Sequence, residues 1–279
     1  MTAALIEVAE LAEMLAGDHP PLLIDAQYWL GEPDRGGNAY AEAHVPGAVH
    51  LSVDEVFSAP PRPDRVGGRH PLPELARLQE QLRAAGLDQG QSVVVYDQGP
   101  SLGAARAWWV LRDAGLCDVR VLNGGLRAWR EAGHPTQTAA PTPSAGDVVI
   151  ERLGHQPQVD AEAVAAALGA GQQVFDVRAP ERFRGEQEPM DPVAGHIPGS
   201  QSLPATVVQG EGGRFLAPDD LREALTQVQP GDVLSCGSGI TAAKVALAAE
   251  QAGLEGVRIY PGSWSDWISD PQRPIATGE

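Results

Sequence analysis

The chain of 279 residues has 20 Lys and Arg against 37 Asp and Glu, which gives a formal net charge of −17 at pH 7. A hydrophobic content of 43% with a charged content of 20% is typical of a globular protein, and the length favours two domains. The negative charge argues against nucleic acid or an anionic membrane as a partner, because the general surface would repel either one.

Short apolar segments alternate with amphipathic segments along the chain. Two amphipathic segments, 8–17 and 160–171, are predicted as helices that each end at a glycine. Strands are predicted for the apolar segments at residues 22–26, 92–96, 119–125, 173–177, 232–236 and 257–262. Strands that are apolar on both faces and separated by helices are typical of a parallel sheet covered on both sides. The predicted fold class is therefore α/β.

The second half of the chain repeats the first, because four sequence patterns recur in the same order with nearly equal spacing. The paired patterns are LLIDAQ with QVFDVR, AHVPGAVHL with GHIPGSQSL, SVVVYDQG with DVLSCGSG, and GGLRAW with GSWSDW. His44 and His196 occupy the same place in the two halves, although only the second half has a cysteine after its strand. A structural role is therefore predicted for both histidines.

The joint between the halves is rich in Pro, Thr and Ala. Residues 131–147 show neither a helical nor an alternating period, which is typical of a linker. We therefore predict a first domain over residues 1–138, a linker over 139–145 and a second domain over 146–279.

The chain has two cysteines, Cys117 and Cys236, which are too few for a disulfide framework and belong to no metal-ligand pattern. The sequence shows neither a signal peptide nor an apolar run of the roughly 18 residues that span a membrane. We therefore expect a cytoplasmic protein in a reducing compartment that keeps Cys236 a thiol.

Cys236 ends the predicted strand 232–236 and is followed by the sequence GSG and an alanine-rich helix. Ligands of parallel α/β sheets lie beyond the carboxyl ends of the strands, so the thiol is expected in that crevice. The glycine spacing fits a dinucleotide-binding fingerprint, but the next strand ends in Tyr260 and Pro261 rather than in an acidic residue. A cysteine phosphatase would need an arginine that closes the loop, and none is present there.

A simple packing role for Cys236 does not explain the two glycines and the serine that follow it. A loop of small residues at a helix N-terminus can instead point several backbone N–H groups at one atom and stabilise an anion. Such surroundings favour the thiolate, which is the nucleophilic form of cysteine. The sequence therefore predicts a reactive thiolate at Cys236, whereas Cys117, which has no such loop, is expected to be structural.

The loop CGSGITA resembles the active-site loop of the two-domain rhodanese-like sulfurtransferases, and within them that of the 3-mercaptopyruvate sulfurtransferases. GHIPGS, GGLRAW and GSW extend the resemblance over nearly the whole chain. It implies two rhodanese-like domains, each a short parallel sheet flanked by helices. It also implies that Cys236 takes a sulfur atom from 3-mercaptopyruvate as a persulfide, without a cofactor or metal ion. The acceptor would be a thiol, such as thioredoxin or a small thiol, or cyanide.

The same resemblance implies roles for other side chains. Ser238, His70 in GGRHPLP and Asp54 in HLSVDEV match the residues that handle the proton of the leaving group. Arg182 in ERFRG matches the arginine that binds the substrate. The substrate-binding loop would also include Gly237, Gly239, Ile240 and Thr241.

Departures from the family pattern leave alternatives open. Met190 stands where a second arginine often follows EP, so thiosulfate is an alternative donor. Thiosulfate enzymes usually have two basic residues directly after the cysteine, whereas this chain has Gly237 and Ser238, which favours mercaptopyruvate. A non-turnover sulfur carrier or thiol sensor is the third alternative. In the first domain Asp97 stands at the cysteine position, so that domain is expected to be catalytically silent, to wall the cleft and to supply His70.

Overall fold

The computed structural model describes residues 3–279 and divides them into two compact units, which are described separately below. The first unit contains the chain up to Ala59, Pro73–His155 and Gly210–Phe215. The second unit contains Pro60–Leu72, Gln156–Gln209 and Leu216–Glu279. Each unit therefore takes one short segment from the other half of the sequence. The domain boundaries at residues 138 and 146 stay a prediction.

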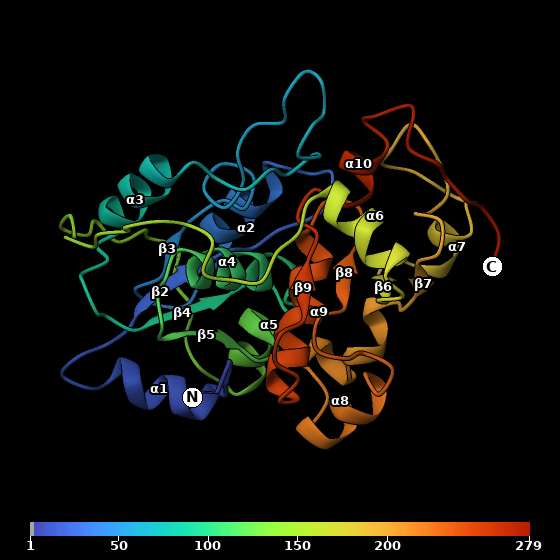
Figure 1. Cartoon of the computed structure of the whole chain (residues 1–279). Coiled ribbons are helices and arrows are strands. Elements are labelled where there is room, and N and C mark those ends of the chain that lie inside the picture. The colour runs from blue at the N-terminus through green and yellow to red at the C-terminus, as the bar shows by residue number, and fades with distance from the viewer. Residues whose placement is uncertain (1–2) are drawn as a thin grey trace. The chain divides into compact units, whose positions relative to one another are not determined.

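The first unit is built on a five-stranded parallel sheet of order β1-β5-β4-β2-β3 (Figure 1). Its strands are β1 (Leu5–Ile6), β2 (Leu22–Asp25), β3 (Val49–His50), β4 (Val93–Tyr96) and β5 (Val119–Leu122). Its helices are α1 (Val8–Leu15), α2 (Arg35–Glu42), α3 (Leu75–Ala84), α4 (Leu102–Asp113) and α5 (Gly125–Glu131), and it also contains the 3₁₀ turn η2 (Glu211–Gly213). The central strands are buried along their whole length, as their apolar sequences predict.

Helices cover the sheet of the first unit. Val94 and Tyr96 of β4 belong to one apolar cluster with residues of α1 and α5, among them Trp129. Side chains alternate along a strand, so Val93 and Val95 point to the opposite face of the sheet. The helix α4 packs on β4 and β5.

The second unit is built on a four-stranded parallel sheet of order β7-β6-β8-β9 (Figure 1). Its strands are β6 (Val174–Asp176), β7 (Gln201–Ser202), β8 (Val233–Ser235) and β9 (Arg258–Ile259). Its helices are α6 (Ala161–Gly169), α7 (Pro180–Phe183), α8 (Pro218–Ala224), α9 (Ile240–Gln251) and α10 (Ser263–Trp267), with a 3₁₀ turn η1 (Ala205–Val208). The helix α6 begins where the Asp160 carboxylate accepts the Ala163 N–H at 2.8 Å.

The core of the second unit joins its sheet to α6 and α10. Val174 and Val233 from the central strands cluster with Trp264 and Trp267 of α10. The helix α9 contacts β8 and β9 and packs against α8. The predicted α/β fold, with a parallel sheet flanked by helices in each unit, is confirmed.

His44 and His196 connect equivalent segments within their own units. The backbone of His44 exchanges two hydrogen bonds of 2.9 Å with Gln137, and that of His196 exchanges bonds of 2.8 and 3.0 Å with Ala276. Each imidazole ring also stacks on an aromatic ring with the centroids 3.8 Å apart. These contacts give both histidines the structural role that the repeat predicts.

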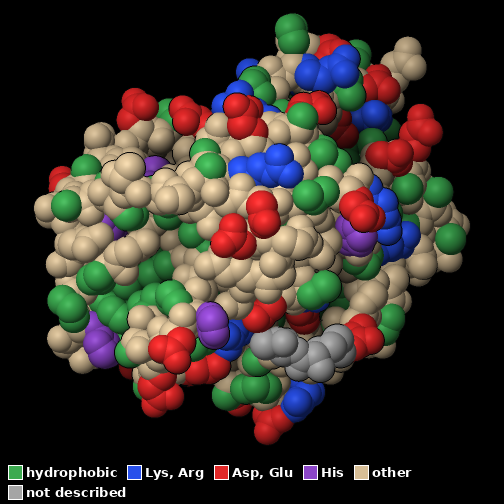
Figure 2. All heavy atoms as spheres, turned by 90° about the vertical axis from the view of Figure 1, so that its left-hand side faces the viewer, with side chains coloured by type: hydrophobic (Ala, Val, Ile, Leu, Met, Phe, Trp, Pro, Cys, Tyr) green, Lys and Arg blue, Asp and Glu red, His purple; other side chains and the backbone are tan. Residues whose placement is uncertain are grey.

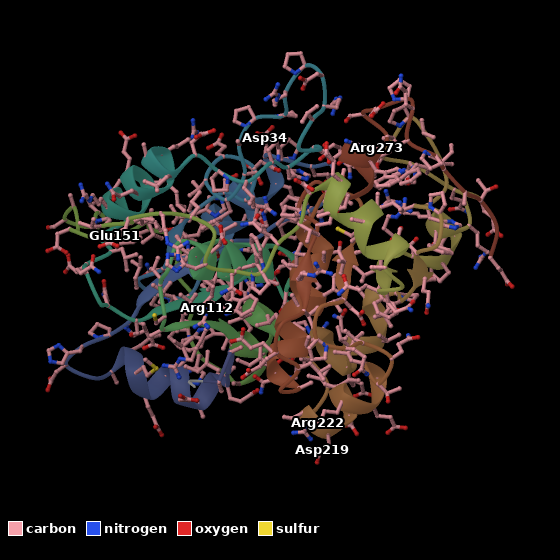
Figure 3. The ribbon with its side chains drawn as sticks, viewed as in Figure 1. Asp34, Arg112, Glu151, Asp219, Arg222 and Arg273 are labelled. Carbon is pink, nitrogen blue, oxygen red and sulfur yellow. The ribbon has the colours of Figure 1, made fainter. Side chains whose placement is uncertain are left out.

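Acidic side chains are spread over the face drawn in Figure 2, with basic side chains between them. Exposed ion pairs such as Arg222 with Asp219 on α8 (Figure 3) contribute little to stability, because water screens them. Within residues 3–279, the structure has no helix with the length and apolar character needed to cross a bilayer.

Candidate active site

Cys236 follows β8 directly and begins the loop that leads into α9. The loop ends at Gly239, which caps the helix with φ of +80°. A Cβ at Gly239 would lie 2.4 Å from the carbonyl oxygen of Pro261, so the site has no room for a side chain. Glycine is therefore required both by the backbone conformation and by the close approach of the neighbouring strand end.

Two groups lie next to the sulfur atom. The Gly239 N–H donates a hydrogen bond to the Sγ of Cys236 at 3.2 Å, and the Oγ of Ser263 lies 3.9 Å from Sγ. Ser263 also accepts the Cys236 N–H at 3.0 Å and donates to the Tyr260 carbonyl at 2.8 Å. The sequence predicts that several backbone N–H groups of the loop surround the sulfur. Among residues 3–279, the Gly239 N–H is the loop amide that lies at hydrogen-bond distance from Sγ. Ser263 has no sequence signal beyond its place in the GSW pattern.

Ser238 and His70 are brought together by the fold. The Nδ1 of His70 lies 2.7 Å from the Oγ of Ser238, two residues after the cysteine. The sequence assigns His70 to the first domain, whereas the structure groups its segment, Pro60–Leu72, with the second unit. Asp54 belongs to the first unit and is half-buried in the turn after β3, so its part in the proton relay stays a prediction.

The segment that carries His70 is anchored to α10. The Gly67 N–H donates to Oδ1 of Asp266 at 2.7 Å, and the Arg69 N–H donates to Oγ of Ser265 at 3.0 Å. The Tyr260 hydroxyl donates to the same Asp266 carboxylate. Burial and the negative charge of Asp266 raise the pKa of Tyr260 above its ordinary value of 10, so the phenol keeps its proton. These contacts hold the segment beside the cysteine loop.

Arg182, at the second-last position of α7, lies beside the cysteine loop, and its substrate-binding role stays a prediction. Its Nη2 lies 3.4 Å from the position that a Cβ of Gly237 would occupy. The Nε–Nη2 edge of the guanidinium is held by Glu188, with Nε at 3.1 Å and Nη2 at 2.7 Å from the carboxylate, and Nη1 lies 3.6 Å from the same Cβ position. Burial alone would raise the pKa of Glu188, but the hydrogen bonds from Arg182 and from the backbone of Met190 outweigh it and lower that pKa. Glu188 therefore fixes the direction in which Arg182 points.

The guanidinium of Arg178 binds two carboxylates and a backbone carbonyl group of its own unit. Its Nε and Nη2 bind the Asp176 carboxylate at the end of β6, its Nη1 binds Glu188 at 3.1 Å, and its Nη2 also donates to the Gly195 carbonyl. Burial alone would lower the pKa of Arg178, but Asp176, Glu188 and the nearby Cys236 outweigh it and raise that pKa. Arg178 is thus a permanent cation whose charge is balanced by two buried carboxylates.

Cys236 is 1% exposed in the structure, although the sequence places it in a crevice at the sheet edge. The next residue, Gly237, is covered by the guanidinium groups of Arg69 and Arg182, whose side chains are each 14% exposed. Of the remaining loop residues, Ile240 is buried and Thr241 is half-buried in the first turn of α9. The thiol is therefore shielded by side chains that surround the loop.

The equivalent loop of the first unit binds a carboxylate of its own chain. Asp97 follows β4 as Cys236 follows β8, and it is fully buried. Its Oδ1 accepts the N–H groups of Gly99 and Ser101 at 2.8 and 3.0 Å, and its Oδ2 accepts those of Gly103 and Ala104 at 3.1 and 3.4 Å. A loop of this kind therefore stabilises an anion with backbone amides, and in the first unit Asp97 supplies that anion.

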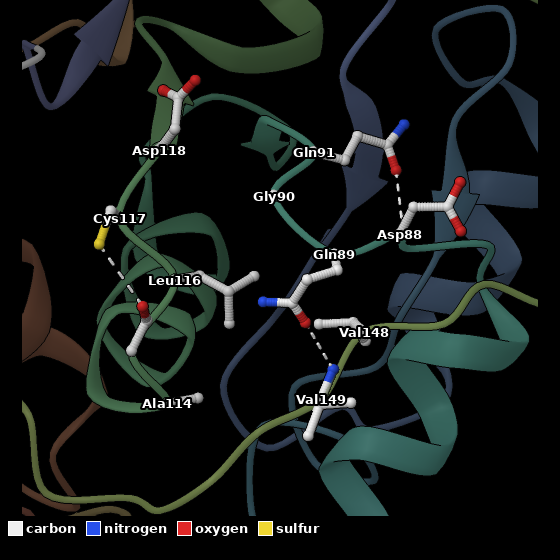
Figure 4. Close-up of a pocket in the computed structure, with 11 residues that line it drawn as sticks. Asp88, Gln89, Gly90, Gln91, Ala114, Leu116, Cys117, Asp118, Val148 and Val149 are labelled. Carbon is white, nitrogen blue, oxygen red and sulfur yellow. Dashed lines mark hydrogen bonds between the residues drawn. The ribbon is translucent and has the colours of Figure 1, made fainter.

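The second cysteine lies in a different environment. Cys117 is exposed at a pocket of the first unit, and its Sγ donates to the Gly115 carbonyl at 3.6 Å (Figure 4). The residues that line this pocket, 88–91, 114–118 and 148–149, include no basic side chain that would stabilise a thiolate. Among residues 3–279, no group of three or more His, Cys, Asp and Glu side chains is arranged to hold a metal ion.

Comparisons with known proteins identify the family. The model of the rhodanese-like domain matches residues 7–132 and again residues 160–270. A protein of Pseudomonas aeruginosa named "Probable 3-mercaptopyruvate sulfurtransferase" is 44% identical over 100% of this chain and 99% of its own length. A Mycobacterium tuberculosis protein named "Putative thiosulfate sulfurtransferase SseB" is 41% identical over 98% of this chain and 97% of its own.

A solved structure agrees with these relatives. The crystal structure of SseA from Escherichia coli, a 3-mercaptopyruvate sulfotransferase, superposes with a TM-score of 0.82. It is 30% identical, and the alignment covers 95% of this chain and 100% of that chain. The chain therefore belongs to the rhodanese-like family, in which it has two tandem copies of the domain. It is a sulfurtransferase, an enzyme that moves sulfur from a small-molecule donor to a thiol acceptor.

Proposed function

We propose that the donor is 3-mercaptopyruvate and that the sulfur is carried as a persulfide on Cys236. The contact between Ser238 and His70 carries this proposal, because it provides a proton relay two residues from the nucleophile. Mercaptopyruvate needs such a relay, since its leaving group is the strongly basic enolate of pyruvate. Thiosulfate does not need one, since its leaving group is sulfite, which is stable as an anion.

The first half-reaction begins with the thiolate of Cys236. It attacks the sulfur of mercaptopyruvate, an S–S bond forms, and the bond between that sulfur and carbon breaks with its electron pair left on carbon. The resulting enolate takes a proton from the hydroxyl of Ser238, which is resupplied through His70, and leaves as pyruvate. The Gly239 N–H, which donates to Sγ, favours a negative sulfur throughout.

The second half-reaction removes the outer sulfur. The thiolate of an acceptor attacks it, a persulfide of the acceptor forms, and the thiolate of Cys236 is regenerated. We assign thioredoxin or a small thiol as the acceptor, with cyanide as an alternative that leaves as thiocyanate. This chemistry needs a free thiol, which agrees with a cytoplasmic location.

Other residues have supporting roles in the proposal. Arg182 binds the carboxylate of mercaptopyruvate with the N–H groups of Nη1 and Nη2 that face Gly237, while Glu188 accepts hydrogen bonds from Nε and Nη2 and keeps the guanidinium in place. The backbone of the loop 237–241 lines the donor site. The first domain is catalytically silent, because Asp97 occupies its anion-binding loop and cannot carry sulfur.

Thiosulfate is the second candidate donor. Met190 follows the EP motif where a second arginine would strengthen binding of a carboxylate, and relatives of this chain include proteins named thiosulfate sulfurtransferase. The loop itself argues the other way, since Gly237 and Ser238 place no cation directly after the cysteine.

Steady-state assays with each donor, at equal acceptor thiol, decide between these functions. The proposal predicts repeated release of pyruvate from mercaptopyruvate and a much lower kcat/KM for thiosulfate. A higher kcat/KM for thiosulfate would contradict the donor assignment. Pyruvate release that stops after one equivalent in the presence of acceptor would instead identify a sulfur carrier.

A further inference from the structure

Residues 60–66, the arm, form an exposed loop of the second unit. Each residue of the arm is exposed, and the segment is the loop at the top of Figure 1. Three of its residues are prolines, at positions 60, 61 and 63, which restrict the backbone. The arm is therefore a stiff surface feature that contributes little to the core.

The shape of the arm is fixed at its tip and at its end. The Asp64 carboxylate accepts hydrogen bonds from Nε of Arg62 at 3.0 Å and from the Val66 N–H at 3.1 Å. Just after the arm, a Cβ on Gly68 would lie 2.5 Å from the carbonyl oxygen of Gly262, so the backbone packs directly on the start of α10. A surface loop held in this way loses little conformational entropy when a partner binds to it.

Arg65 is the unpaired cation of the arm. Its φ is +62°, in the left-handed region that costs free energy for residues other than glycine. Arg62 pairs with Asp64. The guanidinium of Arg65, in contrast, makes no hydrogen bond or ion pair among residues 3–279 that would offset the cost of its backbone. Strained residues of this kind cluster at functional sites, so the conformation of Arg65 indicates a partner outside the chain.

Arg65 lines a pocket of about 170 Å³ in the second unit. The apolar part of its lining comes from Met190, Pro192 and Ile268. Met and Arg are enriched at the centres of protein–protein interfaces, and flexible Met side chains adapt to the groups that they contact. The pocket is therefore suited to an apolar side chain of a partner that also places a negative charge beside Arg65.

The pocket adjoins the cysteine loop. Arg69, which also lines the pocket, has its Nη2 3.1 Å from the position that a Cβ of Gly237 would occupy. The Nη1 of Arg69 is bound by Asp191, which leaves Arg65 to bind the charge of a partner. A molecule that lies on the arm and over the pocket thus has its surface close to the nucleophile.

The charge of this region is opposite to that of the chain as a whole. Pro60–Leu72 has three arginines and one aspartate, whereas the chain has a formal net charge of −17. An acidic partner is repelled by most of such a surface and attracted where positive charge is concentrated. Complementary charges steer the encounter and fix the orientation of the partner. The arm therefore favours the approach of an acidic partner beside the cysteine loop.

We propose that the arm and its pocket are the docking surface for the sulfur acceptor, and that this acceptor is an acidic polypeptide with an apolar residue next to its cysteine. Arg65 pairs with a carboxylate of the partner, while the apolar lining of the pocket contacts the apolar residue. The cysteine of the partner then meets the persulfide of Cys236, as in the second half-reaction. The identity of the transferred group rests on the proposed function, whereas the docking itself is tested without turnover.

The first test measures binding without sulfur chemistry. The probe is a fluorescent peptide with glutamates and one leucine around a serine that replaces the cysteine, and its anisotropy gives the Kd. Arg65→Gln is expected to raise this Kd about tenfold, as the loss of one charge-assisted contact implies, and Arg65→Lys is expected to restore part of the affinity. Arg130→Gln, at an exposed position of α5, is the matched control. An equal Kd in wild type and Arg65→Gln, or equal wild-type affinity for a peptide with glutamines, would overturn the docking surface.

A third variant separates binding from folding. Arg65→Gly removes the charge and relieves the strain at φ of +62°, so thermal unfolding should occur at an equal or higher temperature while binding of the acidic peptide is weakened. A residue that only supported the fold would give the opposite pattern. Unchanged binding by this variant would overturn the pairing of Arg65 with the peptide.

The second test uses sulfur transfer from mercaptopyruvate to the same peptide with its cysteine restored. Arg65→Gln is expected to raise KM for this acceptor about tenfold and to leave KM for 2-mercaptoethanol, a small neutral thiol, unchanged. Met190→Ala should weaken transfer to the leucine peptide but not to one with alanine in its place. An equal rise in KM for both acceptors in Arg65→Gln would overturn the acceptor assignment. Absence of pyruvate release in the wild type would sink the proposed function, while the anisotropy result still decides the docking surface.

Discussion

The Nδ1 of His70 lies 2.7 Å from the Oγ of Ser238, which joins a loop serine to a histidine from a distant segment of the chain. If this pair protonates the enolate, His70→Gln lowers kcat with mercaptopyruvate by about 100-fold, because general acid catalysis contributes at least that much. The rate with thiosulfate changes little, since sulfite leaves without a proton. His19→Gln, at an exposed position, serves as the control. An equal loss with both donors would show that His70 only supports the fold.

Gly239 and Gly253 provide a matched pair at the two ends of α9. Both have positive φ, of +80° and +78°, so alanine at either position costs about 1 kcal/mol of stability. Only at Gly239 would the new Cβ also meet backbone, at 2.4 Å from the Pro261 carbonyl, and displace the N–H that bonds to Sγ. We expect Gly239→Ala to lose most of its activity and Gly253→Ala to keep it. Activity assays on folded protein at low temperature give the comparison, and full activity in Gly239→Ala would contradict the role of that amide.

Asp97 stabilises the first unit as an anion enclosed by amides. Asp97→Asn keeps the shape but turns an amide NH₂ group toward backbone N–H donors, so the free energy of unfolding should fall by roughly 1–3 kcal/mol. Urea denaturation measures this loss. Sulfur transfer by the folded variant should be unchanged, and a specific loss of activity without a loss of stability would contradict the silent role of this unit.

The pair of Glu188 and Arg182 makes stability depend on pH. The pKa of Glu188 is lowered below its ordinary value of 4.5, so its stabilising contribution is complete above that value and is lost as pH falls through the folded-state pKa. Urea denaturation between pH 7 and pH 3 should show a steeper loss in the wild type than in Glu188→Gln. Glu13→Gln, at an exposed position of α1, should follow the wild type. Parallel curves for wild type and Glu188→Gln would show that the pair does not contribute.

The positions of Cys236 and Gly239 could be predicted from local sequence. An apolar run, a glycine-rich turn and an alanine-rich segment indicate a strand, a loop and a helix in that order, and both residues lie in the loop. The pairing of Ser238 with His70 follows from the family resemblance, since the two residues lie far apart in the chain. The position of Arg69 next to Gly237 could not be predicted, because the two residues lie far apart in the sequence and meet only in the folded chain. The contacts of Glu188 with Arg178 and Arg182 could not be predicted either, because they depend on how these side chains are oriented in the folded chain. The burial of Cys236 depends on side chains from separate segments, which the loop sequence alone does not encode.

The most direct test of the account is the intact mass of the protein after reaction with mercaptopyruvate in the absence of an acceptor. The account predicts a gain of one sulfur atom, located at Cys236, with release of one equivalent of pyruvate, and its loss when an acceptor thiol is added. Cys236→Ser should show neither the gain in mass nor the pyruvate. Sustained pyruvate release by Cys236→Ser, or a wild-type protein that turns over without ever gaining the sulfur atom, would contradict a persulfide on this cysteine.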